Sequence, residues 1–149
     1  MSVGEALTCF KAYDVRGKLG EELGPEIAYV IGRATVQSLK TNSVVLGFDA
    51  RETSNGLAKA VARGICDAGA DVLAIGLAGT EEVYAAVMSF NADAGIEVTA
   101  SHNPINYNGM KIVKKGSRPL TDQEFSNIKN LAEKNCFMPS NQSGQIIDK

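Results

Sequence analysis

The residues best equipped for chemistry lie close together in one polar segment, from Ala100 to Asn108. Ser101 contributes a primary hydroxyl, which is a weak nucleophile unless a nearby base or an electrophilic environment activates it. Its neighbours His102 and Asn103, together with Asn108, add hydrogen-bond donors and acceptors. Asn-Pro and Asn-Gly steps in the segment favour tight turns. The pattern is typical of a nucleophile on a fixed loop, although a serine that only stabilises a turn would have the same sequence.

Four further side chains could assist such a serine. His102 is the single histidine of the sequence, and imidazole exchanges protons readily near neutral pH. Lys111 begins the next apolar segment, so its ammonium could contact a bound phosphate or act as an acid. Near the N-terminus, Tyr13 and Arg16 supply a phenol and a guanidinium, and a guanidinium binds phosphate oxygens in a bidentate manner. Taken alone, each of these residues also suits an ordinary exposed position.

Other chemistries have sequence signatures that this chain lacks. It contains neither a GxxxxGK[ST] loop nor a GxGxxG fingerprint, which excludes the P-loop and dinucleotide-binding classes. It has no GxSxG elbow, so a serine hydrolase is disfavoured. No group of histidines, cysteines and carboxylates has the spacing of a zinc site. These absences reduce the number of reactions in which Ser101 could take part, but they do not identify the reaction.

The composition is that of an ordinary globular protein and argues against several partners. The 149 residues are 44% hydrophobic and 21% charged, and no apolar run reaches the roughly 20 residues that span a membrane. A net charge of -2 without a basic run argues against nucleic-acid binding. The three widely spaced cysteines suit reduced thiols, and the N-terminus lacks the basic start of a signal peptide. We therefore expect a cytoplasmic protein with no membrane partner.

Apolar periodicity alternates between helix-like and strand-like segments, which predicts an α/β domain with a largely parallel sheet. The expected elements are strands at 43–48, 71–75, 94–99 and 110–113 and helices at 24–39, 56–68, 80–91 and 121–134. Thr80 and Thr121 are the expected caps of the last two helices, Thr121 through a capping box with Glu124. Polar clusters at 49–51 and 101–103 follow two of the strands, at the edge where open α/β sheets bind ligands.

Four segments occur in the order and wording of one known family. They are Lys11–Gly17 (KAYDVRG), Gly47–Arg51 (GFDAR), Gly79–Tyr84 (GTEEVY) and Gly95–Val113, which contains TASHNP followed by YNGMK. Together they resemble the α-D-phosphohexomutase superfamily of phosphomannomutases and phosphoglucomutases, and their wording is closest to the bacterial phosphomannomutases. The resemblance implies the first domain of that superfamily's fold, a three-layer αβα domain with a mixed, mostly parallel sheet.

The resemblance gives Ser101 the role of a phosphoryl carrier. In the superfamily the matching serine is phosphorylated, donates its phosphoryl group to a hexose phosphate and takes one back from the bisphosphate intermediate. The implied activator is glucose or mannose 1,6-bisphosphate, and the implied metal is Mg2+, bound here only by a phosphate oxygen on Ser101. Asp49 and Arg51 match a segment near the site, and we expect them to act as supporting structure.

The resemblance also supplies partners for the phosphoserine. His102 and Lys111 become candidate proton-transfer groups, and Asn103 lies beside the phosphate. Tyr13 and Arg16 belong to the same site. This set suits phosphoryl transfer, which depends on alignment and on cations around the equatorial oxygens more than on a strong nucleophile.

The remaining machinery of the superfamily is not found in this sequence, which has no DGDGDR-like run. In the superfamily, domains 2 to 4 carry the metal-binding aspartates, the sugar-recognition loop and the substrate phosphate site. We therefore expect residues 1–135 to form the phosphoserine domain of a phosphomannomutase that interconverts mannose 6-phosphate and mannose 1-phosphate, inactive alone. Residues 136–149 would be a linker or the start of a missing second domain.

Two alternatives remain open. The chain could be a phosphosugar-binding or interaction module without turnover, paired with another polypeptide that carries the missing domains. It could also accept a phosphoryl group at Ser101 and go no further. The preference for mannose or glucose is open as well, since the sugar-reading loop of the superfamily lies outside the sequence.

Overall fold

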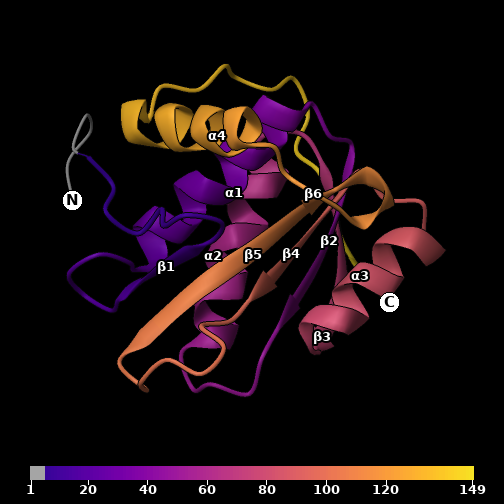
Figure 1. The fold of residues 1–149 in the computed structure, drawn as a ribbon. Helices are drawn as coiled ribbons and strands as arrows, with labels where there is room; N and C mark the ends of the chain where they lie inside the picture. The colour runs from indigo at the N-terminus through magenta and orange to yellow at the C-terminus, as the bar shows by residue number, and fades with distance from the viewer. Residues whose placement is uncertain (1–5) are drawn as a thin grey trace.

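A single mixed sheet between two layers of helices organises the computed structural model, which describes residues 6–149 (Figure 1). The strands lie in the order β1-β5-β4-β2-β3-β7, with β6 paired to β5. They span Val15–Lys18 (β1), Ser43–Phe48 (β2), Asp71–Leu77 (β3), Ala94–Val98 (β4), Tyr107–Lys114 (β5), Arg118–Pro119 (β6) and Ile146–Asp148 (β7). β2 is parallel to β3 and β4, and β3 to β7, whereas β5 runs antiparallel to β4 and β1. The expected mixed, mostly parallel sheet is confirmed.

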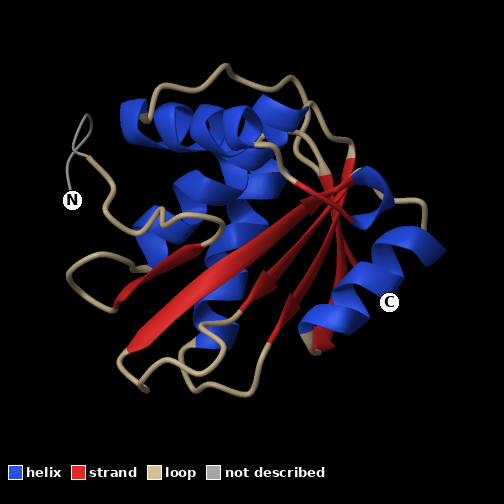
Figure 2. Cartoon of the chain, viewed as in Figure 1, coloured by secondary structure: helices blue, strands red, loops and turns tan. Residues whose placement is uncertain are grey.

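The helices cover the two faces of this sheet unequally (Figure 2). They span Pro25–Leu39 (α1), Ser54–Asp67 (α2), Thr80–Ser89 (α3) and Asp122–Lys134 (α4), with a 3-10 turn at Lys115–Ser117 (η1). α1 packs against both α2 and α4 on one face, whereas α3 packs on β2 and β4 from the other. The three-layer αβα arrangement is confirmed. None of the helices described is long and apolar enough to cross a membrane.

Short-range sequence explains where most of the helices begin. Pro25 occupies the first turn of α1, where its missing N–H would have had no helical partner. Thr121 caps α4 as expected, because its hydroxyl accepts from the backbone of Glu124 at 3.1 Å and its own backbone N–H donates to the Glu124 carboxylate at 2.8 Å. Thr80 is the first residue of α3 and not its cap. Gly79 takes that place, with its N–H donating to Glu82 at 2.9 Å.

Long-range pairing explains the elements that the sequence did not predict. β1 and β6 are too short to show a periodic pattern, and both form by pairing with β5. β5 begins at Tyr107, earlier than expected, because its first half pairs with β1. The tail contributes β7, which pairs in parallel with β3 through Val72 and Ile146. The domain boundary at residue 135 stays a prediction, and residues 1–5, part of the signal-peptide argument, lie outside the described range.

The two faces of the sheet bury different cores, and this decides where charged side chains point. Ile96 and Met110 belong to the larger core under α1, α2 and α4. Val113 belongs to the smaller core under α3, with Val83 and Val87. Because successive strand residues face opposite sides, the strand positions between these core residues point toward α3. Glu97 of β4 and Lys111 of β5 are two such positions, and they are register partners.

Candidate active site

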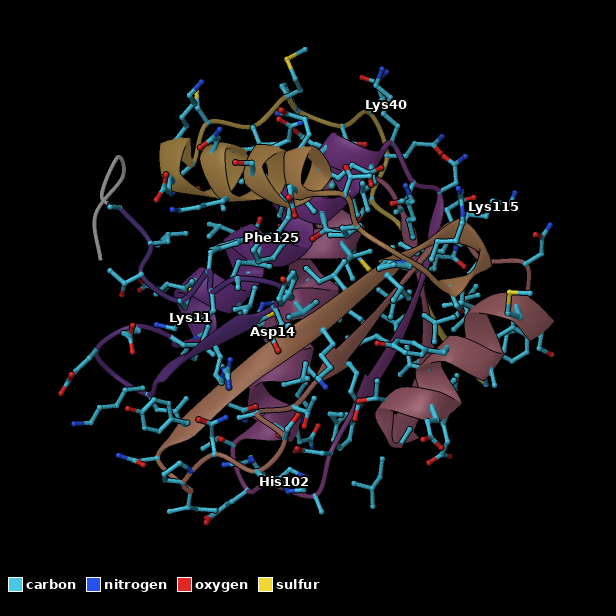
Figure 3. All side chains as sticks on the ribbon, in the orientation of Figure 1. Lys11, Asp14, Lys40, His102, Lys115 and Phe125 are labelled. Carbon is cyan, nitrogen blue, oxygen red and sulfur yellow. The ribbon has the colours of Figure 1, made fainter. Side chains whose placement is uncertain are left out.

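The candidate nucleophile lies on the loop that joins β4 to β5, at the carboxyl end of β4. The turn after β2 lies at the same edge, because β2 and β4 are parallel neighbours. A backbone hydrogen bond of 3.0 Å from Asp49 to the carbonyl of Val98 joins the two segments. Figure 3 places His102 on this loop, at the end of the sheet opposite to Lys115. The two polar clusters identified in the sequence therefore meet.

Asp49 holds one side of the loop through both of its carboxylate oxygens. Oδ2 accepts a hydrogen bond of 2.7 Å from the hydroxyl of Thr99, and Oδ1 accepts from the hydroxyl of Ser54. The Thr99 oxygen in turn accepts from the backbone N–H of Ser101 at 3.0 Å. Asn108 completes the network by donating its side-chain amide to the Ser54 oxygen at 3.0 Å. Ser54 is buried and is the first residue of α2, which therefore begins two residues before the expected Gly56.

Arg51 holds the other side of the loop with its guanidinium. Nη1 donates to the carbonyl oxygens of Pro104 at 2.7 Å and Tyr107 at 3.1 Å. Nη2 donates to the carbonyl oxygens of Ser101 at 3.0 Å and of Asn103. A guanidinium suits this task because its donors are fixed in one plane and it is always charged. The contacts give Asp49 and Arg51 the supporting role that the sequence predicts for them.

Ser101 is exposed and has a strained backbone. Its φ angle is 54°, in the left-handed region that side chains with a Cβ adopt at a cost of about 1–2 kcal/mol. The hydrogen bonds to Thr99 and Arg51 both use the backbone of Ser101, so they hold this conformation without occupying its hydroxyl. Strained residues held by their surroundings are common at functional sites. The loop therefore presents a serine hydroxyl to solvent in a fixed position.

The two neighbours of Ser101 have different surroundings. His102 is exposed on the loop. Asn103 is half-buried, and both its side-chain amide and its backbone N–H donate to the carbonyl oxygen of Ala100, at 2.9 and 3.0 Å. The Asn103 side chain thus closes the turn in this structure, and its contact with a phosphoserine stays a prediction.

A second group of predicted residues gathers at the outer edge of β5. Tyr13 and Lys111 line a cavity of about 230 Å³ together with Asp14 and Tyr84. Tyr13 is 89% exposed at the rim, whereas Lys111 is half-buried. Neither Ser101 nor the residues of its loop line this cavity. The structure thus brings the predicted residues together as a loop group and an edge group.

Arg16 lies between these two groups on β1. Its register partner on β5 is Gly109, three positions from the serine loop. A Cβ on Gly109 would lie 2.1 Å from the carbonyl oxygen of Val15, so only glycine lets β1 approach this closely. The guanidinium of Arg16 is 3.6 Å from the carboxylate of Asp14. Asp14 therefore holds the cation near the edge group.

Glu97 is a charged residue of the site region that sequence reasoning missed. It is 1% exposed, and neither carboxyl oxygen has a hydrogen-bond partner in the described part of the chain. Burial raises the pKa of Glu97 from 4.5 to about 8, with further upward contributions from the charges of Asp49 and Glu82, while Lys111 lowers it. A glutamate inside the otherwise apolar strand segment AGIEV is the signal that could have identified it.

The described residues do not form a metal site of their own. Residues 6–149 contain no group of three or more histidine, cysteine, aspartate or glutamate side chains arranged to hold a metal ion. Mg2+ binds through about six oxygens in octahedral geometry, and a phosphate oxygen on Ser101 would supply one of them. The residues present therefore do not fit a resident Mg2+ without ligands from elsewhere.

The fold and the site define an αβα domain with a serine loop at the carboxyl edge of its sheet, held in place by hydrogen bonds to Asp49 and Arg51. The sequence model of the family described as "Phosphoglucomutase/phosphomannomutase, alpha/beta/alpha domain I" matches residues 7–138, and the chain belongs to this family. The resemblance seen in the sequence is thereby confirmed.

Individual relatives agree with this assignment. The chain is similar to a phosphomannomutase of Klebsiella pneumoniae, 58% identical over 134 residues that make up 89% of this chain and 85% of the relative. It is equally similar to a phosphomannomutase of Escherichia coli, of which those 134 residues cover 29%. The crystal structure of a phosphoglucomutase/phosphomannomutase family protein from Burkholderia thailandensis superposes with a TM-score of 0.86 at 32% identity, over 96% of this chain and 33% of that one. The chain thus spans about a third of these two longer proteins.

Proposed function

We propose that this chain is the phosphoserine-bearing domain of a phosphomannomutase, in which Ser101 carries the phosphoryl group that interconverts mannose 6-phosphate and mannose 1-phosphate. The observation that carries the proposal is the loop itself. Arg51 and Asp49 hold Ser101 in a strained conformation that leaves its hydroxyl exposed. A turn serine with a purely structural role would use its hydroxyl in the turn. Family membership and the names of the relatives support the same assignment.

The reaction consists of two phosphoryl transfers that balance each other. In the first, the bond between phosphorus and the Ser101 oxygen breaks, and a bond forms between phosphorus and a hydroxyl oxygen of the hexose phosphate. The proton of that hydroxyl passes to a base, and the Ser101 oxygen takes a proton from an acid. The resulting 1,6-bisphosphate reorients and returns its other phosphoryl group to Ser101 by the reverse steps. Mannose or glucose 1,6-bisphosphate from solution would load an unphosphorylated serine in the same way.

The remaining predicted residues provide charge and proton transfer. Arg16 and Lys111 would stabilise the equatorial oxygens of the transferred group, which carry the charge in the transition state. Lys111 and His102 are the candidates for the acid and the base. Tyr13 and Asn103 would contact the phosphate or the sugar. These roles require a bound substrate to span the gap between the loop group around Ser101 and the edge group around Lys111.

Other domains of the family must complete the site. Mg2+ would take one ligand from this chain, the phosphate oxygen on Ser101, and the others from outside it. The exposed loop also lacks the cover that excludes water, which protects a phosphoenzyme from hydrolysis. We therefore propose that the chain alone does not turn over hexose phosphates. The separated cysteines fit a reducing compartment, so we place the reaction in the cytoplasm.

The test uses a chimera in which this chain replaces the matching 134-residue segment of the Escherichia coli phosphomannomutase. The chimera is incubated with 32P-labelled mannose 1,6-bisphosphate, and protein-bound label is measured beside the conversion of mannose 6-phosphate. We expect label and turnover in the chimera and neither in its Ser101→Ala variant. Ser126→Ala is the matched control, since Ser126 is an exposed serine on α4, remote from the loop in sequence.

The other possible outcomes would each contradict a specific part of the proposal. Equal labelling of the Ser101→Ala variant would remove Ser101 as the carrier, and so would a folded chimera that takes no label. Turnover by the 149-residue chain alone would contradict the need for further domains. Saturable binding of mannose 6-phosphate by the chain, without labelling of the chimera, would favour the alternative of a phosphosugar-binding module.

A further inference from the structure

Glu97 is a buried acid for which the proposed reaction has no use, and its surroundings are unusual. It lies in the middle of the sheet, with Gly47 of β2 and Lys111 of β5 as its register partners. A Cβ on Gly47 would lie 2.8 Å from Glu97 Oε1 and 2.9 Å from a methyl carbon of Val83. The carboxyl therefore fills the space that Gly47 leaves open, beneath the first turn of α3. Within residues 6–149 both of its oxygens lack a hydrogen-bond partner, which is costly for the fold and calls for an explanation such as a functional role.

Lys111 is the cation that lies opposite this acid in the sheet register. Directly opposed residues of antiparallel strands have Cβ atoms about 4.5–5.5 Å apart on the same face, so both side chains start side by side. The side chain of Lys111 then reaches the cavity of the edge group, where it lies with Tyr13 and Asp14. No ion pair holds its ammonium within residues 6–149. No ion pair within the described residues therefore has to break for Lys111 to turn toward the sheet or toward a phosphate.

We propose that Glu97 is a positioning residue that acts through Lys111. As a neutral acid it leaves the ammonium of Lys111 free to meet the phosphoryl group on Ser101, and as a carboxylate it draws that ammonium back over the sheet. The inference rests on the proposed function, because it assigns Lys111 a place beside the phosphate.

The other charged and titratable groups around Glu97 favour its neutral form. Asp49 faces it from the turn after β2, and Glu82 and Tyr84 from α3, while Lys111 on β5 is the single cation among them. Burial and the two carboxylates raise the pKa of Glu97 to about 8. A phosphoryl dianion on Ser101 would raise it further, because like charges disfavour ionisation. Loading of Ser101 and protonation of Glu97 are therefore coupled, and both release Lys111.

The interaction between Glu97 and Lys111 can be measured on the 149-residue chain itself, without substrate. In protein labelled with [5-13C]glutamate, the Glu97 carboxyl is assigned by its absence in Glu97→Gln and titrated by NMR. We expect a midpoint near 8, and a rise of at least half a pH unit in Lys111→Gln, because that change removes the cation that stabilises the carboxylate. Lys115→Gln is the control, since Lys115 is exposed and lies 4.0 Å from Asp93 instead. An unchanged midpoint in Lys111→Gln would overturn the inference.

Turnover of the chimera gives the second measurement. We expect activity to fall as pH rises through about 8 in the parent chimera and this alkaline fall to be absent from Glu97→Gln, which mimics the neutral acid. Glu81→Gln, an exposed position on α3, should keep the parent profile. A parent profile retained in Glu97→Gln would sink the inference while leaving Ser101 as the carrier. Failure to label Ser101 would instead count against the proposed function and leave the NMR titration as it stands.

Discussion

Arg51 donates a hydrogen bond of 3.0 Å from Nη2 to the carbonyl oxygen of Ser101, across 50 residues of sequence. The same guanidinium also donates to the carbonyl oxygens of Asn103 and Pro104 in the serine loop and of Tyr107 at the start of β5. These contacts point the loop's carbonyl groups inward to one cation. They explain how an exposed serine can be held in place without using its own hydroxyl.

Removing Arg51 should therefore loosen the loop and destabilise the fold. We expect Arg51→Ala to lower the free energy of unfolding by about 2–4 kcal/mol, because several charge-assisted hydrogen bonds are lost together. Arg51→Lys should recover less than half of that, since an ammonium cannot reproduce the planar fork. Urea denaturation of the three proteins at pH 7 tests this, and equal stability of Arg51→Lys and the parent would contradict it.

The backbone conformation of Ser101 should lower the stability of the fold, whereas the proposed function needs the serine hydroxyl at this position. Glycine adopts a φ of 54° without the Cβ penalty. We expect Ser101→Gly to be more stable than Ser101→Ala by about 1 kcal/mol, since both lack the hydroxyl but only alanine keeps the strain. Thermal unfolding of the two variants measures the difference. Identical midpoints would show that the surroundings impose no strain on Ser101.

Glu97 should make stability depend on pH in a window that ordinary glutamates do not reach. Its pKa is raised from 4.5 to about 8, so between these values the folded chain binds more protons than the unfolded chain. Stability therefore falls as pH rises through this window, by at most about 1.4 kcal/mol per pH unit. Glu97→Gln should lack this contribution, and Glu81→Gln should retain it. Parallel stability curves for the parent and Glu97→Gln would refute the shift.

Substitution by alanine should change the stability of the fold in opposite directions at two glycines, Gly109 and Gly56. At Gly109 the new Cβ would lie 2.1 Å from the Val15 carbonyl oxygen, so Gly109→Ala must push β1 away, and we expect a loss of about 2–4 kcal/mol. At Gly56, within α2, a Cβ meets nothing within 4 Å. Gly56→Ala should stabilise the fold by about 0.5–1 kcal/mol. Chemical denaturation of both variants measures this, and a tolerated Gly109→Ala would show that β1 is loosely held.

Local features of the sequence determined most of the regular elements. The run SVVLGF forms β2 at the predicted residues, and the capping box at Thr121 begins α4. Pro25 begins α1. These elements depend on interactions within a few residues, so a single sequence carries the information. The wording of the segment around Ser101 likewise identified the family, because the chemistry of the loop is written in consecutive residues.

The tertiary structure decided whatever depends on residues far apart in the chain. β1 exists only through its pairing with β5, and Gly109 permits that pairing from a position about ninety residues away. Arg51 could be predicted to lie near the loop, but its four carbonyl acceptors required the folded chain. In the sequence, Glu97 is a single charged residue in an apolar strand. Only the packing under α3 shows that its carboxyl is buried from solvent and lacks hydrogen-bond partners among the described residues. Burial and electrostatics are sums over neighbours that the fold assembles, so they cannot be computed from sequence spacing alone.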